Sequence, residues 1–93
     1  YRTAVVGKWH LQDAPQGFDY SCVLPGQGLY FDPVFLENGQ KKTFQGYATD
    51  ITTDFALNWL KQQGSGQPWC LVFQHKSPHR PFLPAPRHAK LLA

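Results

Sequence analysis

The apolar residues of this chain gather in two short runs and one longer periodic segment. Residues 3–8 contain a β-branched run that ends in a lysine, and residues 69–73 form a continuous apolar run. Runs of this length predict strands, and an uninterrupted one is typical of a strand buried in a parallel sheet. Between them, residues 49–63 show the three-to-four-residue spacing of an amphipathic helix.

The predicted helix carries an apolar stripe along one face. Its members are Ile51, Phe55, Ala56, Trp59 and Leu60. Thr49 or Asp50 can cap the first turn, and Gly64 is a natural terminator after the last one. We expect the stripe to pack in the core rather than to hold a cofactor.

Turn-forming residues fill the segments that connect these elements. Residues 12–38 are rich in glycine, proline and aromatics, which predicts an irregular loop, and residues 64–68 form a second loop. Asn38-Gly39 is a strong turn signal and indicates a short hairpin at residues 37–40. The order strand, loop, helix, strand is that of a βαβ crossover, so the predicted class is α/β.

The composition is that of a packed globular chain. Of the 93 residues, 42% are hydrophobic and 15% are aromatic, which is enough for one small core. No run approaches the roughly 18 apolar residues that span a bilayer. The chain begins at Tyr1 without a methionine, and residues 90–93 resemble the interior of a helix, so we expect a piece of a longer protein. A missing targeting segment then says nothing about the compartment.

Charge and cysteine content narrow the possible partners. The net charge is +3, and the basic residues are scattered along the sequence. They form no basic stripe with stacking aromatics, which argues against a nucleic-acid partner. Two cysteines at this spacing are neither a disulfide framework nor a zinc site. Cys70 lies in an apolar run, and we expect it to be buried.

The first candidate chemistry comes directly after the first strand, in the motif Gly7-Lys8-Trp9-His10-Leu11. If the strand continues through the motif, Lys8 and His10 point to one side and Trp9 to the other. An ammonium beside a titratable imidazole is suited to handling an anion. Alone, the motif is equally compatible with a basic strand end that carries an ordinary core tryptophan.

The second candidate is the histidine-proline loop, residues 75–88, which comes after the second strand. Its polar side chains are His75, Lys76, His79, Arg80, Arg87 and His88. Four interleaved prolines restrict the backbone, so its histidines lose little entropy on binding. Both histidine motifs lie at the carboxyl ends of strands, where ligands collect in α/β sheets. On these residues alone, the alternative is a proline-rich connector with surface histidines.

The spacing of His75 and His79 also raises the question of a zinc site. Two histidines four residues apart bind zinc when they share a helix face, but Pro78 and Pro81 disfavour a helix here. No carboxylate or cysteine lies nearby in the sequence. We therefore predict no metal site in this loop.

Taken together, the motifs resemble those of the formylglycine-dependent sulfatases of the alkaline-phosphatase-like superfamily. The resemblance comprises residues 7–11, Gly17-Phe18-Asp19, residues 46–56 and residues 75–82, in the family's order and spacing. It implies a partial alkaline-phosphatase-like fold, a strand–loop–helix–strand piece of a larger mixed sheet. Residues 1–93 would then be an internal fragment of a single catalytic domain.

The resemblance also implies roles in the hydrolysis of sulfate esters. Lys8 would contact the aldehyde hydrate of formylglycine and the sulfate oxygens, and His10 would assist proton removal. His79 would be the general acid for the leaving oxygen. The substrate entrance would be lined by His75, Lys76 and Arg80.

Other parts of the family's site are absent from this chain. The Cys-x-Pro-Ser-Arg nucleophile motif is missing, and Cys22 has neither its spacing nor its arginine. The paired acidic residues and the Asp-Asn pair of the calcium site are missing too, and a further lysine would lie beyond Ala93. The formylglycine and the calcium ligands are thus expected outside this chain, which alone should not turn over substrate.

The expected substrate is a sulfated carbohydrate, such as a glycosaminoglycan or a mucin-type sugar, which suits the positive charge of residues 75–88. Two alternatives remain open: a phosphodiester or phosphonate ester hydrolase of the same superfamily, and a catalytically dead relative that binds carbohydrate. Family members are commonly exported (periplasmic or secreted) or lysosomal, so the resemblance implies such a location. No oligomeric state can be inferred from the sequence.

Overall fold

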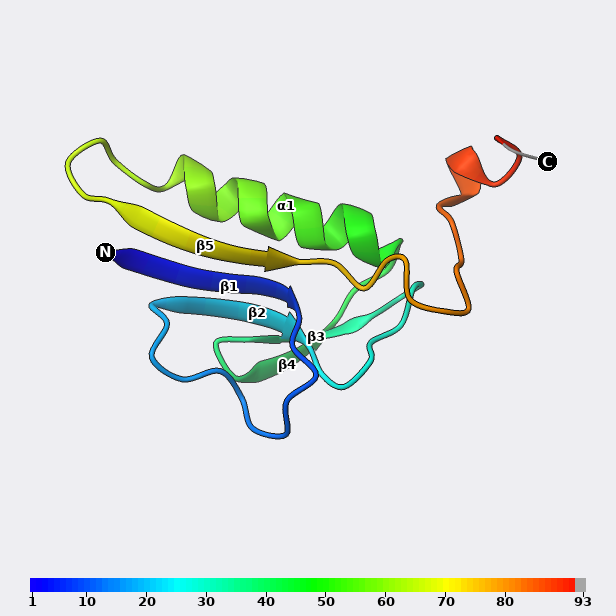
Figure 1. The fold of residues 1–93 in the computed structure, drawn as a ribbon, viewed down its shortest axis with the longest axis horizontal. Coiled ribbons are helices and arrows are strands. Elements are labelled where there is room, and N and C mark those ends of the chain that lie inside the picture. Colours follow the sequence, from blue (N-terminus) through cyan, green and yellow to red (C-terminus); the bar gives the residue numbers. More distant parts are fainter. Residues whose placement is uncertain (92–93) are drawn as a thin grey trace.

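The computed structural model describes residues 1–91 as a five-stranded mixed sheet with one helix packed on a face (Figure 1). The strands are β1 (Arg2–Lys8), β2 (Tyr20–Leu24), β3 (Val34–Glu37), β4 (Gln40–Thr43) and β5 (Trp69–Gln74). The helix is α1 (Ala48–Lys61), and a short 3-10 helix, η1 (Pro86–His88), lies in the C-terminal segment. The predicted α/β class and the strand, helix, strand order are confirmed.

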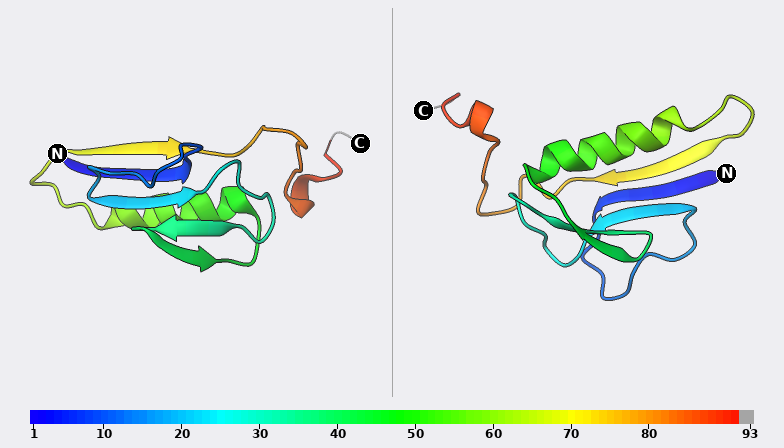
Figure 2. Two further views of the ribbon diagram at one scale, coloured as in Figure 1. Left: turned by 90° about the horizontal axis from the view of Figure 1, so that it is seen from below. Right: turned by 180° about the vertical axis from the view of Figure 1, so that it is seen from behind.

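Three neighbouring strands of the sheet are parallel. The order is β4-β3-β2-β1-β5, with β1 parallel to β2 and β5, while β3 is antiparallel to both β2 and β4. The helix α1 connects the β3–β4 hairpin to β5 and runs along one face of the sheet, as Figure 2 shows from two sides. The carboxyl ends of β2, β1 and β5 therefore share one edge.

The core lies between α1 and the sheet. Cys22, Leu24 and Phe35 are fully buried, and Phe44 and Phe55 pack against them. The ring centroids of the three phenylalanines lie 5.2 to 5.7 Å apart in tilted or edge-on pairs, a geometry that stabilises beyond the burial of area. The apolar stripe predicted for the helix is confirmed as core packing.

The segment predicted as an irregular loop, residues 12–38, contains both β2 and β3, so that prediction was wrong in part. β2 is short, and every one of its residues pairs with β1, from Tyr20 opposite Ala4 to Leu24 opposite Lys8. The strand is therefore defined by a partner distant in sequence, which a local pattern does not show. The hairpin expected at residues 37–40 is confirmed as the turn between β3 and β4.

The first turn of α1 differs from the predicted one. The helix begins one residue earlier, and its N-cap, Tyr47, makes no side-chain capping bond. The expected caps are used elsewhere: the Thr49 hydroxyl lies 3.2 Å from that of Ser77, and Asp50 accepts two hydrogen bonds from Arg87. The start of the helix thereby holds the histidine-proline loop instead of capping itself.

β5 is not the fully buried strand that its sequence predicts. It lies at the edge of the sheet with β1 as its neighbour, and Trp69, Cys70 and Phe73 are exposed. The expectation of a buried Cys70 is wrong for this structure, because an edge strand with an open face cannot bury its apolar run. Cys22 is the buried cysteine, and burial raises the pKa of its thiol to about 12.

No helix within residues 1–91 is long and apolar enough to cross a membrane. The helical interior expected at residues 90–93 falls partly on residues 92–93, which lie outside the described part of the chain. Up to Leu91, this end of the chain consists of η1 and the turns after it.

Candidate active site

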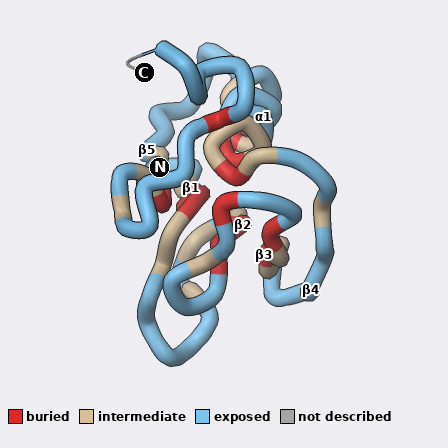
Figure 3. The backbone as a smooth tube through the Cα atoms, turned by 90° about the vertical axis from the view of Figure 1, so that its right-hand side faces the viewer, coloured by how far each residue is buried: buried red, intermediate tan, exposed pale blue. Residues whose placement is uncertain are grey.

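The candidate site lies at the shared carboxyl edge of β2, β1 and β5. The pairing register places Lys8 opposite Leu24, the last residue of β2, with the end of β5 beside them. Figure 3 looks onto this edge, where buried residues lie in the strands and α1 and exposed loops surround them. The loops after these strands, residues 9–19, 25–33 and 75–85, are therefore neighbours, as expected for a ligand site in an α/β sheet.

A glycine allows two of these strands to approach closely. Gly7 has φ +117°, and a Cβ at this position would lie 1.6 Å from the carbonyl oxygen of Gln74. The strand that carries Lys8 can therefore lie against β5 only with glycine at this position. In the sequence, the signal for this requirement is the glycine itself, directly before Lys8.

Two ammonium groups lie close together at this edge. Lys8 is half-buried at the end of β1, and Lys76, the second residue after β5, is 7% exposed. Burial lowers the pKa of Lys76, and the positive charge of Lys8 lowers it further. The structure thus brings together one lysine from each of the two histidine motifs.

His10 does not continue the strand, so the predicted alternation through Lys8, Trp9 and His10 is not what the structure shows. β1 ends at Lys8, and His10 has φ +49°, in the left-handed region. The indole Nε1 of Trp9 donates a 2.8 Å hydrogen bond to the carbonyl oxygen of Asp13. The exposed imidazole of His10 meets the side-chain amide nitrogen of Gln27, which lies 3.0 Å from Nε2 and 3.3 Å from Nδ1.

The loop after β2 joins the two histidine motifs. Lys76 Nζ donates a 3.0 Å hydrogen bond to the carbonyl oxygen of Gln27 and lies 4.8 Å from the centroid of the Tyr30 ring. The Tyr30 hydroxyl donates to the carbonyl oxygen of His79. Gln27 and Tyr30 belong to the segment predicted as irregular, and no motif marks them. The available signal is the pair of glycines that flank Gln27.

The main chain orients the ring of His79. Its Nδ1 lies 2.6 Å from the carbonyl oxygen of Arg80, which can only accept, so Nδ1 carries the proton in this contact. Nε2 is left for a second partner. The amide of His79 donates to the carbonyl oxygen of Lys76 at 3.0 Å, which closes a tight turn. The half-buried His79 is thus held on both sides, while the side chain of Arg80 is exposed.

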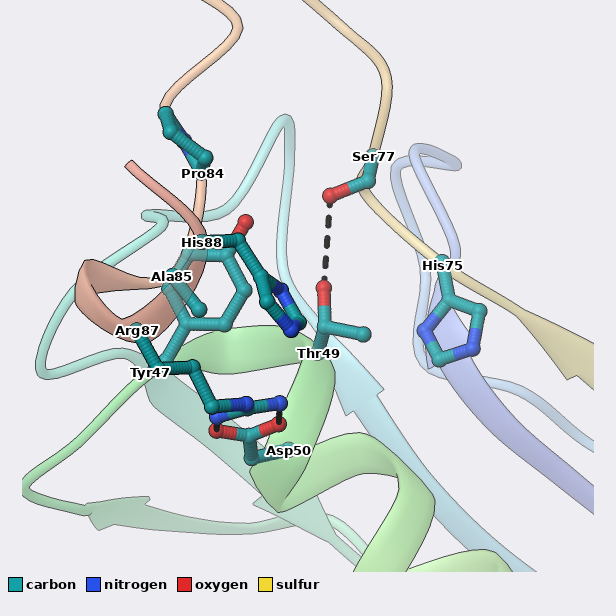
Figure 4. Close-up of a pocket in the computed structure, with 9 residues that line it drawn as sticks. All are labelled: Tyr47, Thr49, Asp50, His75, Ser77, Pro84, Ala85, Arg87 and His88. Carbon is teal, nitrogen blue, oxygen red and sulfur yellow. Dashed lines mark hydrogen bonds and ion pairs between the residues drawn. The ribbon is translucent and has the colours of Figure 1, made fainter. Parts of the chain in front are cut away.

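His75 lines a separate cavity of about 300 Å³ between the first turn of α1 and the C-terminal segment (Figure 4). The lining residues are Tyr47, Thr49, Asp50, His75, Ser77, Pro84, Ala85, Arg87 and His88. Among residues 1–91, the buried Nδ1 of His75 has no hydrogen-bond partner, and burial lowers the pKa of this ring. The structure therefore brings Lys8, His10, Lys76 and His79 together at the strand edge and places His75 apart from them.

Within residues 1–91, no three His, Cys, Asp or Glu side chains converge as a metal site. Three carboxylates are instead engaged with other partners: Asp19 with Thr3, Glu37 with Lys42, and Asp50 with Arg87. The residues present therefore do not fit the calcium ion that the family resemblance implies.

Similarity to known proteins places the chain in a family. The family model described as Sulfatase matches residues 1–91. The chain belongs to the sulfatase family. An N-acetylglucosamine-6-O-sulfatase of Bacteroides thetaiotaomicron is 50% identical, over 95% of this chain and 16% of the relative. A protein solved in complex with its substrate, D-glucosamine-2-N,6-O-disulfate, is 48% identical with a TM-score of 0.92, over 98% of this chain and 19% of that one.

The family match confirms the resemblance drawn from the collinear motifs, and the TM-score confirms that the chain forms part of a sulfatase fold. The present chain spans less than a fifth of the length of either similar protein. The individual roles of Lys8, His10 and His79 stay predictions.

Proposed function

We propose that the protein containing this chain is a sulfatase that hydrolyses sulfate esters of sugars, and that this chain supplies one side of its active site. The observation that carries the proposal is the joining of the two histidine motifs at the strand edge through Gln27 and Tyr30. Membership of the sulfatase family supports the reaction. The glucosamine derivatives named for both similar proteins support the substrate class.

Lys8 and Lys76 supply positive charge where a sulfate ester would lie. Cations fixed in place before the reaction stabilise the negative charge that builds on the oxygens around sulfur. Lys76 is fixed in this way by the carbonyl oxygen of Gln27 and the ring of Tyr30. Formylglycine would supply the nucleophile, and we assign it and the calcium to residues outside this chain, because no three His, Cys, Asp or Glu side chains converge within residues 1–91.

The two imidazoles handle protons on opposite sides of the ester. His10 accepts a proton on the side of the nucleophile, and His79 protonates the leaving alcohol oxygen as the sulfur–oxygen bond breaks. His79 can do so through Nε2, because Nδ1 is committed to the carbonyl oxygen of Arg80. An Nδ1–H is present in both the neutral and the charged ring, so this contact persists when Nε2 gains or loses its proton.

Leaving-group dependence in the full-length protein tests the role of His79. His79→Ala should lower turnover of a sugar 6-sulfate by about 10²–10⁴-fold, and that of an activated aryl sulfate much less, because a good leaving group needs little protonation. His88→Ala, which removes an exposed histidine outside the strand edge, is the matched control and should leave both rates unchanged. Equal losses on both substrates would contradict the general-acid role. Preferential hydrolysis of the corresponding phosphate ester would instead assign the protein to the phosphoester hydrolases.

Peptide mass mapping of the native full-length protein tests the expected nucleophile. A peptide with a cysteine converted to formylglycine in a Pro-Ser-Arg context would establish the sulfatase chemistry. An unmodified residue at that position would exclude the formylglycine mechanism.

A further inference from the structure

Gln27 contacts both histidine motifs at once. We propose that Gln27 is a positioning residue: its side-chain amide orients the ring of His10, while its main-chain carbonyl holds the ammonium of Lys76 beside Lys8. The inference rests on the proposed function, since the group that it positions is the proton acceptor of that reaction. No sequence motif points to Gln27. One of its contacts is made by the side chain and the other by the main-chain carbonyl.

The turn that carries Gln27 has a defined shape. The amide of Gly28 donates to the carbonyl oxygen of Pro25 at 3.2 Å, which closes a turn over residues 25–28. Gly26 and Gly28 have φ of +58° and +74°, which residues with a Cβ rarely adopt. With these dihedrals fixed on both sides, the side chain of Gln27 meets the first motif and its carbonyl meets the second.

The ring of His10 depends on an outside partner for its orientation. It is exposed, it lies beyond the end of β1, and within residues 1–91 its hydrogen-bond contacts are those with Gln27. An amide nitrogen can only donate, and a neutral imidazole has one accepting nitrogen. The contact therefore orients the ring only while it is neutral, and the hydrogen bond from Gln27 is given up when the accepting nitrogen of His10 takes the proton from the nucleophile's side.

The main-chain contact of Gln27 acts on the other motif. Lys76 is 7% exposed and lies near the like charge of Lys8, so its ammonium needs partners that compensate for lost water. The carbonyl oxygen of Gln27 and the face of the Tyr30 ring provide them. Substitution of the Gln27 side chain leaves the carbonyl in place, so the effect on His10 can be measured by itself.

Gln27→Met in the full-length protein tests the inference, because methionine keeps the length of the side chain and removes the amide. Gln27 is exposed, so the core is untouched. We expect kcat to fall about tenfold or more through misplacement of His10. The loss should be equal on a glucosamine 6-sulfate and an activated aryl sulfate, with KM unchanged, because His10 does not act on the leaving group. Gln16→Met, the same change in an exposed neighbouring loop, should have no effect.

A double-mutant cycle on the aryl sulfate separates positioning from a general loss of structure. In a His10→Ala background, Gln27→Met should cause no further loss, because its effect passes through the missing ring. Additive losses, a change confined to KM, or an unchanged kcat in Gln27→Met would each overturn the inference while leaving the sulfatase proposal intact. Wild-type turnover of His10→Ala would overturn both this inference and the proposed role of His10.

Discussion

The two halves of the sheet differ in the connections that leave their strands. The parallel strands β2, β1 and β5 end at one edge, where the last residue of β1, Lys8, and the loops after β1 and β5 carry the lysines and histidines of the proposed site. The antiparallel hairpin of β3 and β4 closes with Asn38-Gly39, and its polar side chains Glu37 and Lys42 pair with each other. Parallel strands require long connections, which can present side chains, whereas a two-residue turn is occupied with reversing the chain.

The hairpin still stabilises the strands that carry the site, because it contributes to the same hydrophobic core. Phe35 of β3 is fully buried against β2 and the helix, in the cluster with Cys22 and Leu24. The contrast therefore predicts a division of effects. Substitutions at the parallel edge should change catalysis, or the geometry on which it depends, and substitutions in the hairpin should change stability alone.

The largest effect is expected for Gly7→Ala, where the new Cβ would lie 1.6 Å from the carbonyl oxygen of Gln74 at a φ of +117°. Backbone strain and overpacking each cost about 1–3 kcal/mol, and this contact is with main chain that cannot move aside. We expect the full-length variant to lose most of its free energy of unfolding in chemical denaturation. Gly64→Ala, in open space, should shift it by less than about 0.5 kcal/mol. A stable, active Gly7→Ala protein would contradict the close approach of β1 and β5.

Phe35→Ala should destabilise the full-length protein by about 3–5 kcal/mol, because it leaves a cavity among the packed rings of Phe44 and Phe55. Its kcat, normalised to the folded fraction, should equal that of the wild type. Denaturation curves together with turnover below the unfolding transition measure the two quantities. Phe35→Leu fills most of the cavity and should cost less than about 1.5 kcal/mol. A lower kcat in the folded fraction of Phe35→Ala would contradict the proposal that hairpin substitutions change stability alone.

Lys8→Ala and Lys42→Ala compare one lysine from each half. Lys8→Ala should lower kcat/KM by about 10²–10³-fold, the cost typical of losing one charge-stabilising group. The loss should be similar for sugar and aryl sulfates, because Lys8 is proposed to act on the sulfuryl group rather than the leaving oxygen. Lys42→Ala should leave kcat/KM unchanged. If the loss in Lys8→Ala depended strongly on the leaving group, Lys8 would act on the leaving oxygen rather than on the sulfuryl group.

Local patterns were sufficient for the elements whose residues interact with near neighbours in sequence. The helix was predictable from the spacing of Ile51, Phe55 and Trp59, and the hairpin from Asn38-Gly39. The strand β2 was not, because its evidence is pairing with β1, and the exposure of β5 was not, because burial depends on what covers a strand. The capping of α1 was missed since Thr49 and Asp50 serve the distant histidine-proline loop.

The candidate site divides in the same way. Lys8, His10 and His79 were named from motifs, and the parallel register explains why they converge. Gln27 and Tyr30 were not named, and one contact of each uses a main-chain carbonyl as acceptor: Lys76 donates to that of Gln27, and Tyr30 donates to that of His79. Every residue has such a carbonyl, so residue type carries no signal for it. The side chains that carry the proposed chemistry were therefore predictable, and the contacts that position them were not.

The smallest effect is expected for Lys42→Ala, measured as the loss in free energy of unfolding at different pH values. Hydrogen bonds from Lys42 and Tyr20 lower the pKa of Glu37 below its ordinary value of 4.5. The pairing therefore contributes stability above that pH, and the contribution is lost as the pH falls through the lower pKa of the folded state. At pH 7 the substitution should cost about 0.2–1 kcal/mol, as for other exposed pairs.

The cost of Lys42→Ala should then shrink on acidification, which denaturation midpoints of wild type and variant at pH 7 and at about pH 3.5 would measure. Lys41→Ala, the exposed neighbouring lysine on β4, controls for the general change in charge and should show a smaller dependence on pH. A cost that stayed constant between the two pH values would mean that Lys42 stabilises β4 through its alkyl chain rather than through Glu37. The hairpin would then differ from the parallel edge more sharply than proposed, because even its charged side chains would act by packing.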